Sequence, residues 1–117
     1  MENKSYTIKD IKEGLSKGHF SAEEILKKYE ERIKKENKKL NAFLAPFRFV
    51  DERLNLPEGP LHGVPYALKD NILLKNSLTT AGSKMLENYR ASFDATVVKK
   101  LRTAGAICLG KTNMDEF

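Results

Sequence analysis

Hydrophobic residues recur at helical spacing in the first part of the chain. The spacing predicts a helix that Thr7 caps and that runs to about Lys17, where Gly18 supplies a left-handed stop. The apolar face of this helix consists of Ile8, Ile11 and Leu15. A polar surface with one apolar stripe of this kind indicates a helix that packs against a core on one side only.

A second amphipathic helix follows at once. Ser21 and Glu24 form the pattern of a capping box, and the helix is expected to end near Asn37. Its apolar positions are Ile25, Leu26, Tyr29 and Ile33, and its polar face carries most of the lysines. Residues 40–44 then have the pattern of a short extended segment.

The middle of the chain is punctuated by proline and glycine. Residues 46–63 are therefore predicted to be irregular, with one helical turn around 50–54. Residues 64–69 alternate as a strand, and Pro65 near its start excludes an ordinary central ladder position there. Residues 78–80 form a second extended piece, and Ser83 is expected to cap a helical turn that reaches residue 88.

The last third contains the pattern strand, helix, strand. Asp94 is expected to cap a helix that Gly105 ends, and the apolar residues 106–109 follow as a strand. This order is typical of α/β folds. Thr112 then resembles the cap of a further helix, and the apolar Phe117 with nothing after it suggests an interrupted chain. We expect three segments: helical residues 1–45, an irregular connection at 46–63, and the start of an α/β core at 64–117.

Composition narrows the function classes. The chain has 117 residues and a net charge of +5, and residues 1–50 carry 12 basic and 8 acidic side chains. A basic front half permits a nucleic-acid partner, although acidic residues alternate with the lysines without interleaved aromatic residues, which favours a solvated helix face. No apolar run approaches the roughly 18 residues of a membrane span. We expect a cytoplasmic protein with no membrane association.

Cysteine and histidine offer little chemistry. The single cysteine, Cys108, excludes an internal disulfide and lies in an apolar run, which favours a buried structural thiol in a reducing compartment. His19 and His62 have no ligand partners at metal-binding spacing, so no metal site is predicted.

Lys69 is the candidate catalytic residue. It closes an apolar strand, where burial would disfavour the ammonium form, and a neutral lysine is a base. The alternative is a solvated lysine at the rim of the sheet. Nearby Ser77, Ser83 and Ser92 lie in predicted loops or caps and are interpreted as structural. Asp70 would keep Lys69 protonated if the two side chains touched, but neighbours on a strand point to opposite faces.

The motifs around Lys69 resemble the amidase signature family. The run from Gly63 to Asn71 is similar to the lysine-bearing motif of that family. The resemblance continues in order through residues 79–89, 94–98, 101–102, 104–106 and 110–117, and residues 21–24 and 40–43 match the front of the family. It therefore covers almost the whole chain.

The resemblance implies a fold and a mechanism. The fold would be the N-terminal part of the amidase-signature α/β fold, with helices packed on a mixed sheet, incomplete as it stands. The family hydrolyses carboxamides with a nucleophilic serine, a second serine on a cis peptide bond, and a lysine that Lys69 matches. Both serines lie downstream of the motif at 115–117 and are absent here, so the 117-residue chain alone is expected to be inactive.

Within the family, the runs at 83–89 and 111–117 look most like the glutamine-hydrolysing subunits of tRNA-dependent amidotransferases. That likeness implies ammonia release from glutamine, B- and C-type partner subunits, and conversion of misacylated Glu-tRNA(Gln) or Asp-tRNA(Asn). It also implies that ATP and magnesium act in the partner subunit, which contacts most of the tRNA, and that this segment binds no cofactor. Two alternatives remain open: a stand-alone amidase, and a non-catalytic binding module.

Overall fold

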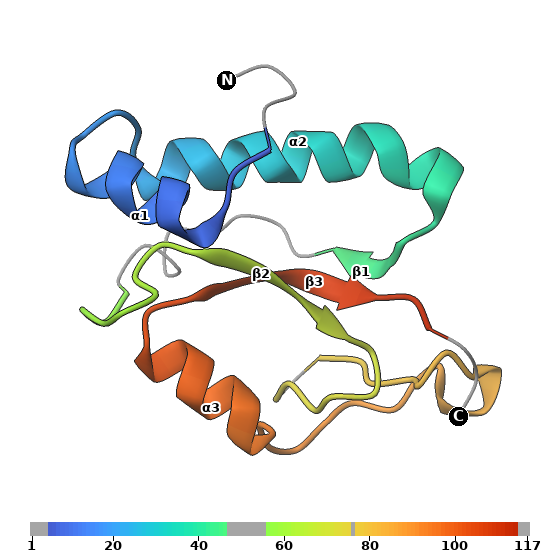
Figure 1. Cartoon of the computed structure of the whole chain (residues 1–117). Helices are drawn as coiled ribbons and strands as arrows, with labels where there is room; N and C mark the ends of the chain where they lie inside the picture. The colour runs from blue at the N-terminus through green and yellow to red at the C-terminus, as the bar shows by residue number, and fades with distance from the viewer. Residues whose placement is uncertain (1–4, 47–55, 76, 115–117) are drawn as a thin grey trace.

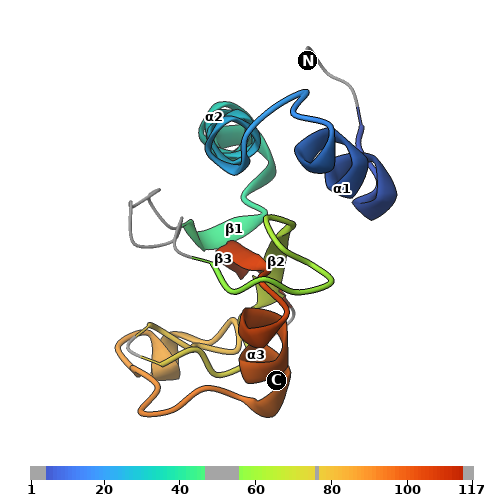
Figure 2. The same cartoon turned by 90° about the vertical axis from the view of Figure 1, so that its left-hand side faces the viewer.

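The computed structural model describes residues 5–46, 56–75 and 77–114. Its elements are α1 (Ile8–Ser16), α2 (Ala22–Leu40), β1 (Phe43–Pro46), β2 (Pro65–Lys69), the 3₁₀ helix η2 (Lys84–Leu86), α3 (Thr96–Thr103) and β3 (Ile107–Thr112). The sheet has the order β1-β3-β2, with β3 antiparallel to β1 and parallel to β2. Helices α1 and α2 lie on one side of the sheet and α3 on the other (Figures 1 and 2). The predicted α/β class, helices on a mixed sheet, is confirmed.

Local capping chemistry sets the two N-terminal helices. Thr7 and Ser21 each accept a hydrogen bond from the backbone of the third helical residue, and the side chains of Asp10 and Glu24 accept one in return from the cap backbone. Gly18 follows α1 with φ +72°, in the left-handed region that the sequence predicted. Both helices therefore begin where residue type alone indicates.

Helix α2 is three residues longer than expected. It continues past Asn37 to Leu40 and stops at Asn41, which has φ 51°. Asn37 lies within the helix, and its side chain makes two hydrogen bonds to a residue beyond the helix. Its amide donates to the Phe43 carbonyl (2.9 Å), and its oxygen accepts from the Phe43 N–H (2.8 Å). These two bonds connect the last turns of α2 directly to strand β1.

The β2–α3–β3 unit forms a parallel crossover. Pro65 opens β2, a strand on the edge of the sheet, where the missing N–H of proline is tolerated. Gly105 ends the unit's helix with φ +89°, and the Gly105 and Ala106 amides donate to the carbonyls of Arg102 and Leu101, the two bonds of a Schellman motif. The predicted glycine stop is confirmed.

Other predicted boundaries in the described residues are also wrong. The extended segment expected at 40–44 is β1 at Phe43–Pro46, because Leu40 still belongs to α2. Asp94 does not cap α3: the cap is Ala95, without a side-chain hydrogen bond. The helix predicted after Thr112 does not begin at 113 or 114, and residues 115–117 lie outside the described residues; the strand predicted at 106–109 extends to Thr112. Ser83 does cap a turn, but η2 ends at Leu86, two residues short of the predicted end. The helical turn predicted at 50–54 lies outside the described residues.

The core joins the two N-terminal helices to the start of β2. Ile11, Phe20, Ile25 and Val64 form one buried cluster. Ile8, which was predicted to belong to the apolar face of α1, is 55% exposed. Gly14 is required in this cluster, because an added Cβ would lie 2.3 Å from the Phe20 ring. Segments 1–45 and 64–117 thus share a core where they meet, and the division into three segments stays a prediction.

Instead of capping α3, the Asp94 carboxylate forms hydrogen bonds to residues distant in the sequence. Its Oδ1 accepts from the Lys75 backbone N–H (2.8 Å), and its Oδ2 accepts from the Arg102 guanidinium. The bond to Arg102 and, against the cost of burial, the bond to Lys75 hold the pKa of Asp94 below its usual range. Asp94 therefore ties the segment before residue 76 to α3.

Asp94→Asn should reduce the free energy of unfolding at neutral pH by about 1–2 kcal/mol. This value is kept small because the Arg102 side chain is half exposed and water screens the ion pair. Since the folded-state pKa is lowered, the stabilisation exists above the unfolded pKa and disappears as pH falls through the folded value. Urea unfolding at pH 7 and near pH 3 should therefore show a larger difference at pH 7. Equal differences at both pH values, or an equal effect of Glu87→Gln, would contradict this role.

Candidate functional site

Lys69 is the last residue of β2 and lies beside Thr112 of β3. Its side chain is exposed in the described part of the chain. It lines an open groove of about 670 Å³ at the carboxyl ends of the two parallel strands. The groove residues are Leu40, Asn41, Ala42, Lys69, Thr112, Asn113 and Met114. Carboxyl ends of parallel strands are a common location for ligand sites in α/β proteins.

Asn113 connects two of the segments that line this groove, the end of β3 and residues 41–42. Its backbone N–H donates to the Ala42 carbonyl (2.7 Å), and its side-chain amide donates to the Asn41 carbonyl (3.2 Å). These bonds hold the end of β3 against the segment that leaves α2. Lys69 therefore faces a groove whose walls come from three separate parts of the sequence.

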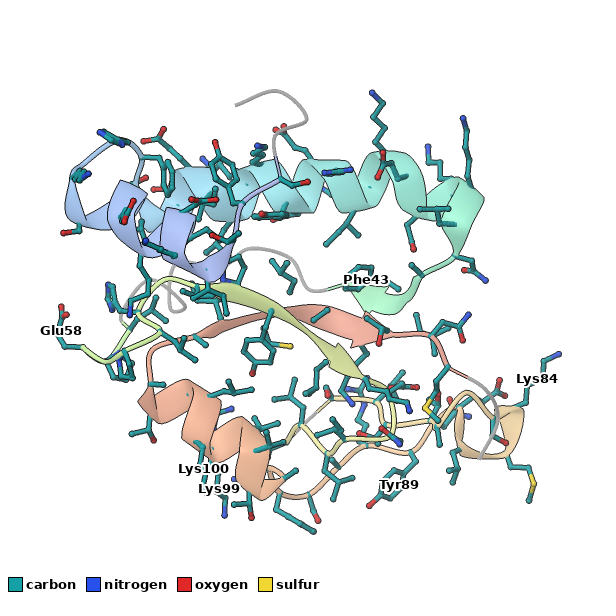
Figure 3. The ribbon with its side chains drawn as sticks, in the orientation of Figure 1. Phe43, Glu58, Lys84, Tyr89, Lys99 and Lys100 are labelled. Carbon is teal, nitrogen blue, oxygen red and sulfur yellow. The ribbon has the colours of Figure 1, made fainter. Side chains whose placement is uncertain are left out.

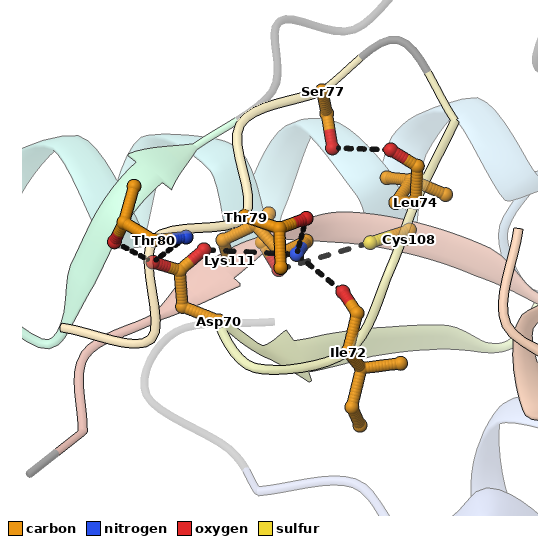
Figure 4. Close-up of polar contacts among 9 residues, drawn as sticks. Asp70, Ile72, Leu74, Ser77, Thr79, Thr80, Cys108 and Lys111 are labelled. Carbon is orange, nitrogen blue, oxygen red and sulfur yellow. Dashed lines mark hydrogen bonds and ion pairs between the residues drawn. The ribbon is translucent and has the colours of Figure 1, made fainter. Parts of the chain in front are cut away.

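Asp70 points to the other face of the sheet and is 1% exposed. Its Oδ2 accepts from the Thr80 backbone N–H (3.1 Å) and from the Thr80 hydroxyl (Figure 4). Its backbone N–H donates to the Thr112 carbonyl (3.2 Å), and its carbonyl accepts from the Ala81 N–H (3.2 Å). Asp70 is thus buried directly after the end of β2, whereas its neighbour Lys69 is exposed.

Lys111 is a buried charged residue next to the site that the sequence interpretation missed. Its side chain is 0% exposed, and Nζ donates to the Ile72 carbonyl (2.5 Å) and to Thr79 Oγ1 (3.3 Å). Nζ also lies 3.6 Å from Asp70 Oδ1, so the two residues form a buried ion pair (Figure 4). The sequence offered only a weak signal, a lysine at the end of an apolar run. Regular alternation from Ile107 does not place Lys111, because the register of β3 against β2 shifts between Cys108 and Lys111.

Electrostatics differ sharply between the two lysines. Burial lowers the pKa of Lys111, and the neighbouring Asp70 carboxylate opposes part of that effect. Lys69, in contrast, is open to solvent on its groove side. In the described residues, the desolvated lysine is therefore Lys111 of the central strand and not Lys69 of the edge strand.

The remaining candidates have structural roles. Ser77 donates to the Leu74 carbonyl (2.9 Å), and Ser83 accepts from the Met85 N–H (3.2 Å) at the start of η2. Cys108 is half-buried on β3, and its thiol donates to the Gly110 carbonyl. His62 Nδ1 lies 3.0 Å from the Pro57 carbonyl oxygen. Residues 5–46, 56–75 and 77–114 contain no group of three or more histidine, cysteine or acidic side chains suited to a metal ion.

The basic surface of the front half is paired along α2. Three ion pairs at i, i+4 spacing join Glu23 to Lys27, Glu30 to Lys34, and Arg32 to Glu36, at 3.2–3.4 Å. On α3, Lys99 and Lys100 extend away from the sheet (Figure 3). These arrangements agree with solvated helix faces.

None of the described helices is long and apolar enough to cross a membrane.

Comparison with known sequences finds a family match over most of the chain. The model of the family described as Amidase matches residues 24–117. The chain is 41% identical to the A-type subunit of glutamyl-tRNA(Gln) amidotransferase from Alkaliphilus metalliredigens and 44% identical to that from Halothermothrix orenii. In both cases the match covers 100% of this chain, which spans about a quarter of each relative's length (26% and 25%).

Solved structures give the same assignment of the fold. The native peptide amidase of Stenotrophomonas maltophilia superposes with a TM-score of 0.84 at 30% identity, over 98% of this chain and 26% of the amidase. The A-type subunit of glutamyl-tRNA(Gln) amidotransferase from Thermotoga maritima has a TM-score of 0.60 at 37% identity, over 83% of this chain and 23% of the relative. The arrangement of α1–α3 and β1–β3 is therefore that of the corresponding quarter of these enzymes.

Proposed function

The chain belongs to the Amidase family, and we propose that it is the N-terminal part of the glutamine-hydrolysing subunit of a tRNA-dependent amidotransferase. The observation that carries this proposal is the 41–44% identity to the A-type subunits of such enzymes along the whole chain. The peptide amidase of similar fold is less similar in sequence, at 30%. Because the chain spans about a quarter of its relatives, the activity belongs to the full-length protein.

In the proposed mechanism Lys69 is the base. A neutral Lys69 amine takes the proton of a nucleophilic serine by way of a second serine, and the serine oxygen attacks the carbonyl carbon of the glutamine side chain. When the C–N bond breaks, the proton returns to the leaving nitrogen, and ammonia departs from an acyl-enzyme that water then hydrolyses. The two serines come from the rest of the protein, so the 117 residues alone should be inactive.

This mechanism requires Lys69 to lose its proton. The groove around Lys69 is open in the described residues, whereas a base of this kind works in a site from which water is excluded. We propose that the remaining three quarters of the protein cover the groove. Covering would exclude water from around the Lys69 side chain, as this mechanism requires.

The proposed assembly follows from the same likeness. The full-length protein would act in the cytoplasm and pass ammonia to B- and C-type partner subunits. The partner would use ATP and magnesium to activate a misacylated Glu-tRNA(Gln) or Asp-tRNA(Asn) and would contact most of the tRNA. This segment would bind no cofactor of its own.

Steady-state ammonia release by the full-length protein tests the proposal. Glutamine should be hydrolysed with the partner subunits present, and ATP plus misacylated tRNA should raise the rate at least about tenfold, because coupled conformational steps assemble such sites. A peptide amide without partner subunits serves as the comparison substrate. Rapid cleavage of the peptide amide, with no tRNA-dependent release from glutamine, would contradict the proposal.

That outcome would favour a stand-alone amidase. A specific observation supports this second candidate: the TM-score is higher with the peptide amidase (0.84) than with the Thermotoga maritima protein (0.60). Fold similarity and sequence identity thus point to different members of one family. The substrate comparison decides between them.

A further inference from the structure

We infer that Lys111 is a positioning residue for Lys69. The buried Lys111 ammonium bonds to the Ile72 carbonyl and pairs with the Asp70 carboxylate, and these contacts hold the turn that follows Lys69 at the end of β2. This inference rests on the proposed function, in which Lys69 is the base. Lys111 does not face the groove and is not proposed to touch substrate.

A short chain of hydrogen bonds links the two lysines. Lys111 Nζ donates to the Ile72 carbonyl at 2.5 Å, and the Ile72 N–H donates to the Lys69 carbonyl at 3.0 Å. Ile72 is therefore held on one side by Lys111 and holds Lys69 on the other. Losing the first bond would leave the Ile72 carbonyl without the Lys111 ammonium as a donor.

Asp70, the residue next to Lys69, is the second member of a buried cluster that we call the clamp: Lys111, Asp70 and the groups they bind, the Ile72 carbonyl and Thr80. Its carboxylate lies between the Lys111 ammonium (3.6 Å) and the Thr80 N–H (3.1 Å), and its backbone bonds to Thr112 and Ala81. Both charged side chains are almost fully buried, at 0% and 2% exposure. Asp70 thus joins the end of β2 to the segment at 79–81, with Lys111 as the neutralising charge.

Stability alone does not explain why a charged pair, Lys111 and Asp70, is buried here. A buried ion pair contributes little net stability relative to well-packed apolar side chains, because desolvation offsets the attraction. Burial also lowers the pKa of Lys111, which shows that the site is a costly place for an ammonium. The ion pair instead fixes the geometry of the turn after Lys69, because each of its bonds ends on that turn or on the segment that packs against the turn.

The test uses Lys111→Met in the full-length protein with its partner subunits. Methionine has similar length and no donor. Because small displacements of a catalytic group reduce turnover strongly, kcat for amide hydrolysis should fall about 10- to 100-fold, with KM changed less than about threefold. Val98→Ala is the matched control: Val98 is 1% exposed in α3, so its truncation lowers the melting temperature without reaching the clamp.

Hydrogen exchange supplies a readout that needs no activity. In Lys111→Met, the Ile72 and Thr80 amides should exchange at least about tenfold faster, while the Lys99 and Ala104 amides of α3 keep their rates. An opened turn with unchanged kcat, or unchanged exchange at Ile72 in an active enzyme, would overturn the inference alone. A wild-type protein that hydrolyses no amide would instead overturn the proposed function, and the catalytic part of this inference with it.

A second variant covers failure to fold. Lys111→Met leaves the Asp70 carboxylate buried without its partner, which is strongly destabilising. Asp70→Asn/Lys111→Met removes both charges and keeps an oxygen that can accept from Thr80. This double variant should fold and still show the reduced kcat, because the Ile72 carbonyl has lost its donor. Wild-type kcat in the folded double variant would overturn the inference.

Discussion

Replacing Lys69 by methionine in the full-length protein should reduce kcat for amide hydrolysis about 10³- to 10⁴-fold, because the reaction loses its general base. The fold should be unaffected: the side chain is exposed at the groove, and substitutions of exposed residues change stability by about 0.5 kcal/mol or less. Steady-state kinetics, with circular dichroism melting on the same preparations, measures both effects.

Two comparisons make the Lys69 result specific. Lys69→Arg keeps the positive charge but cannot give up a proton, so it should be as inactive as the methionine variant. Lys84→Met removes another exposed lysine, from η2, and should leave kcat unchanged. A loss of less than about tenfold in Lys69→Met would contradict a base and return Lys69 to a solvated residue at the sheet edge.

Gly105→Ala is expected to be the most destabilising small substitution in the described core, at about 3 kcal/mol or more. Gly105 has φ +89°, and an added Cβ would lie 2.6 Å from the Pro57 carbonyl oxygen and 2.8 Å from His62 Cα. Backbone atoms cannot rotate away as a side chain can. The clash would push the end of α3 from the loop that leads into β2. Urea unfolding of the full-length protein, or its soluble yield, measures the loss.

Gly18→Ala is the matched control for this prediction. Gly18 has a similar φ of +72°, but an added Cβ would have nothing within 4 Å. Its substitution should therefore cost only the backbone term, about 1 kcal/mol. Equal losses for the two variants would mean that the loop at Pro57 and His62 yields, and that close packing there is unimportant.

The helices and their stops followed from local rules. Capping boxes at Thr7 and Ser21, and glycines at Gly18 and Gly105, depend on neighbours within a few residues, so sequence alone predicts them. The β2–α3–β3 order was predictable for the same reason. Asp94 shows the limit: the residue type suits a helix cap, but Lys75, 19 residues away, and Arg102 use its carboxylate instead.

The two lysines show what only the tertiary structure decided. Lys69 and Lys111 each stand at or near the end of an apolar strand, so sequence pattern treats them alike. In the fold, β3 is the central strand and β2 an edge, and Lys111 is buried while Lys69 lines an open groove. Strand order depends on contacts between distant segments, and so do the bonds of Lys111 to Asp70, Ile72 and Thr79. Sequence alone therefore determined the elements and the family, and the packing of β3 between β1 and β2 determined which lysine is desolvated.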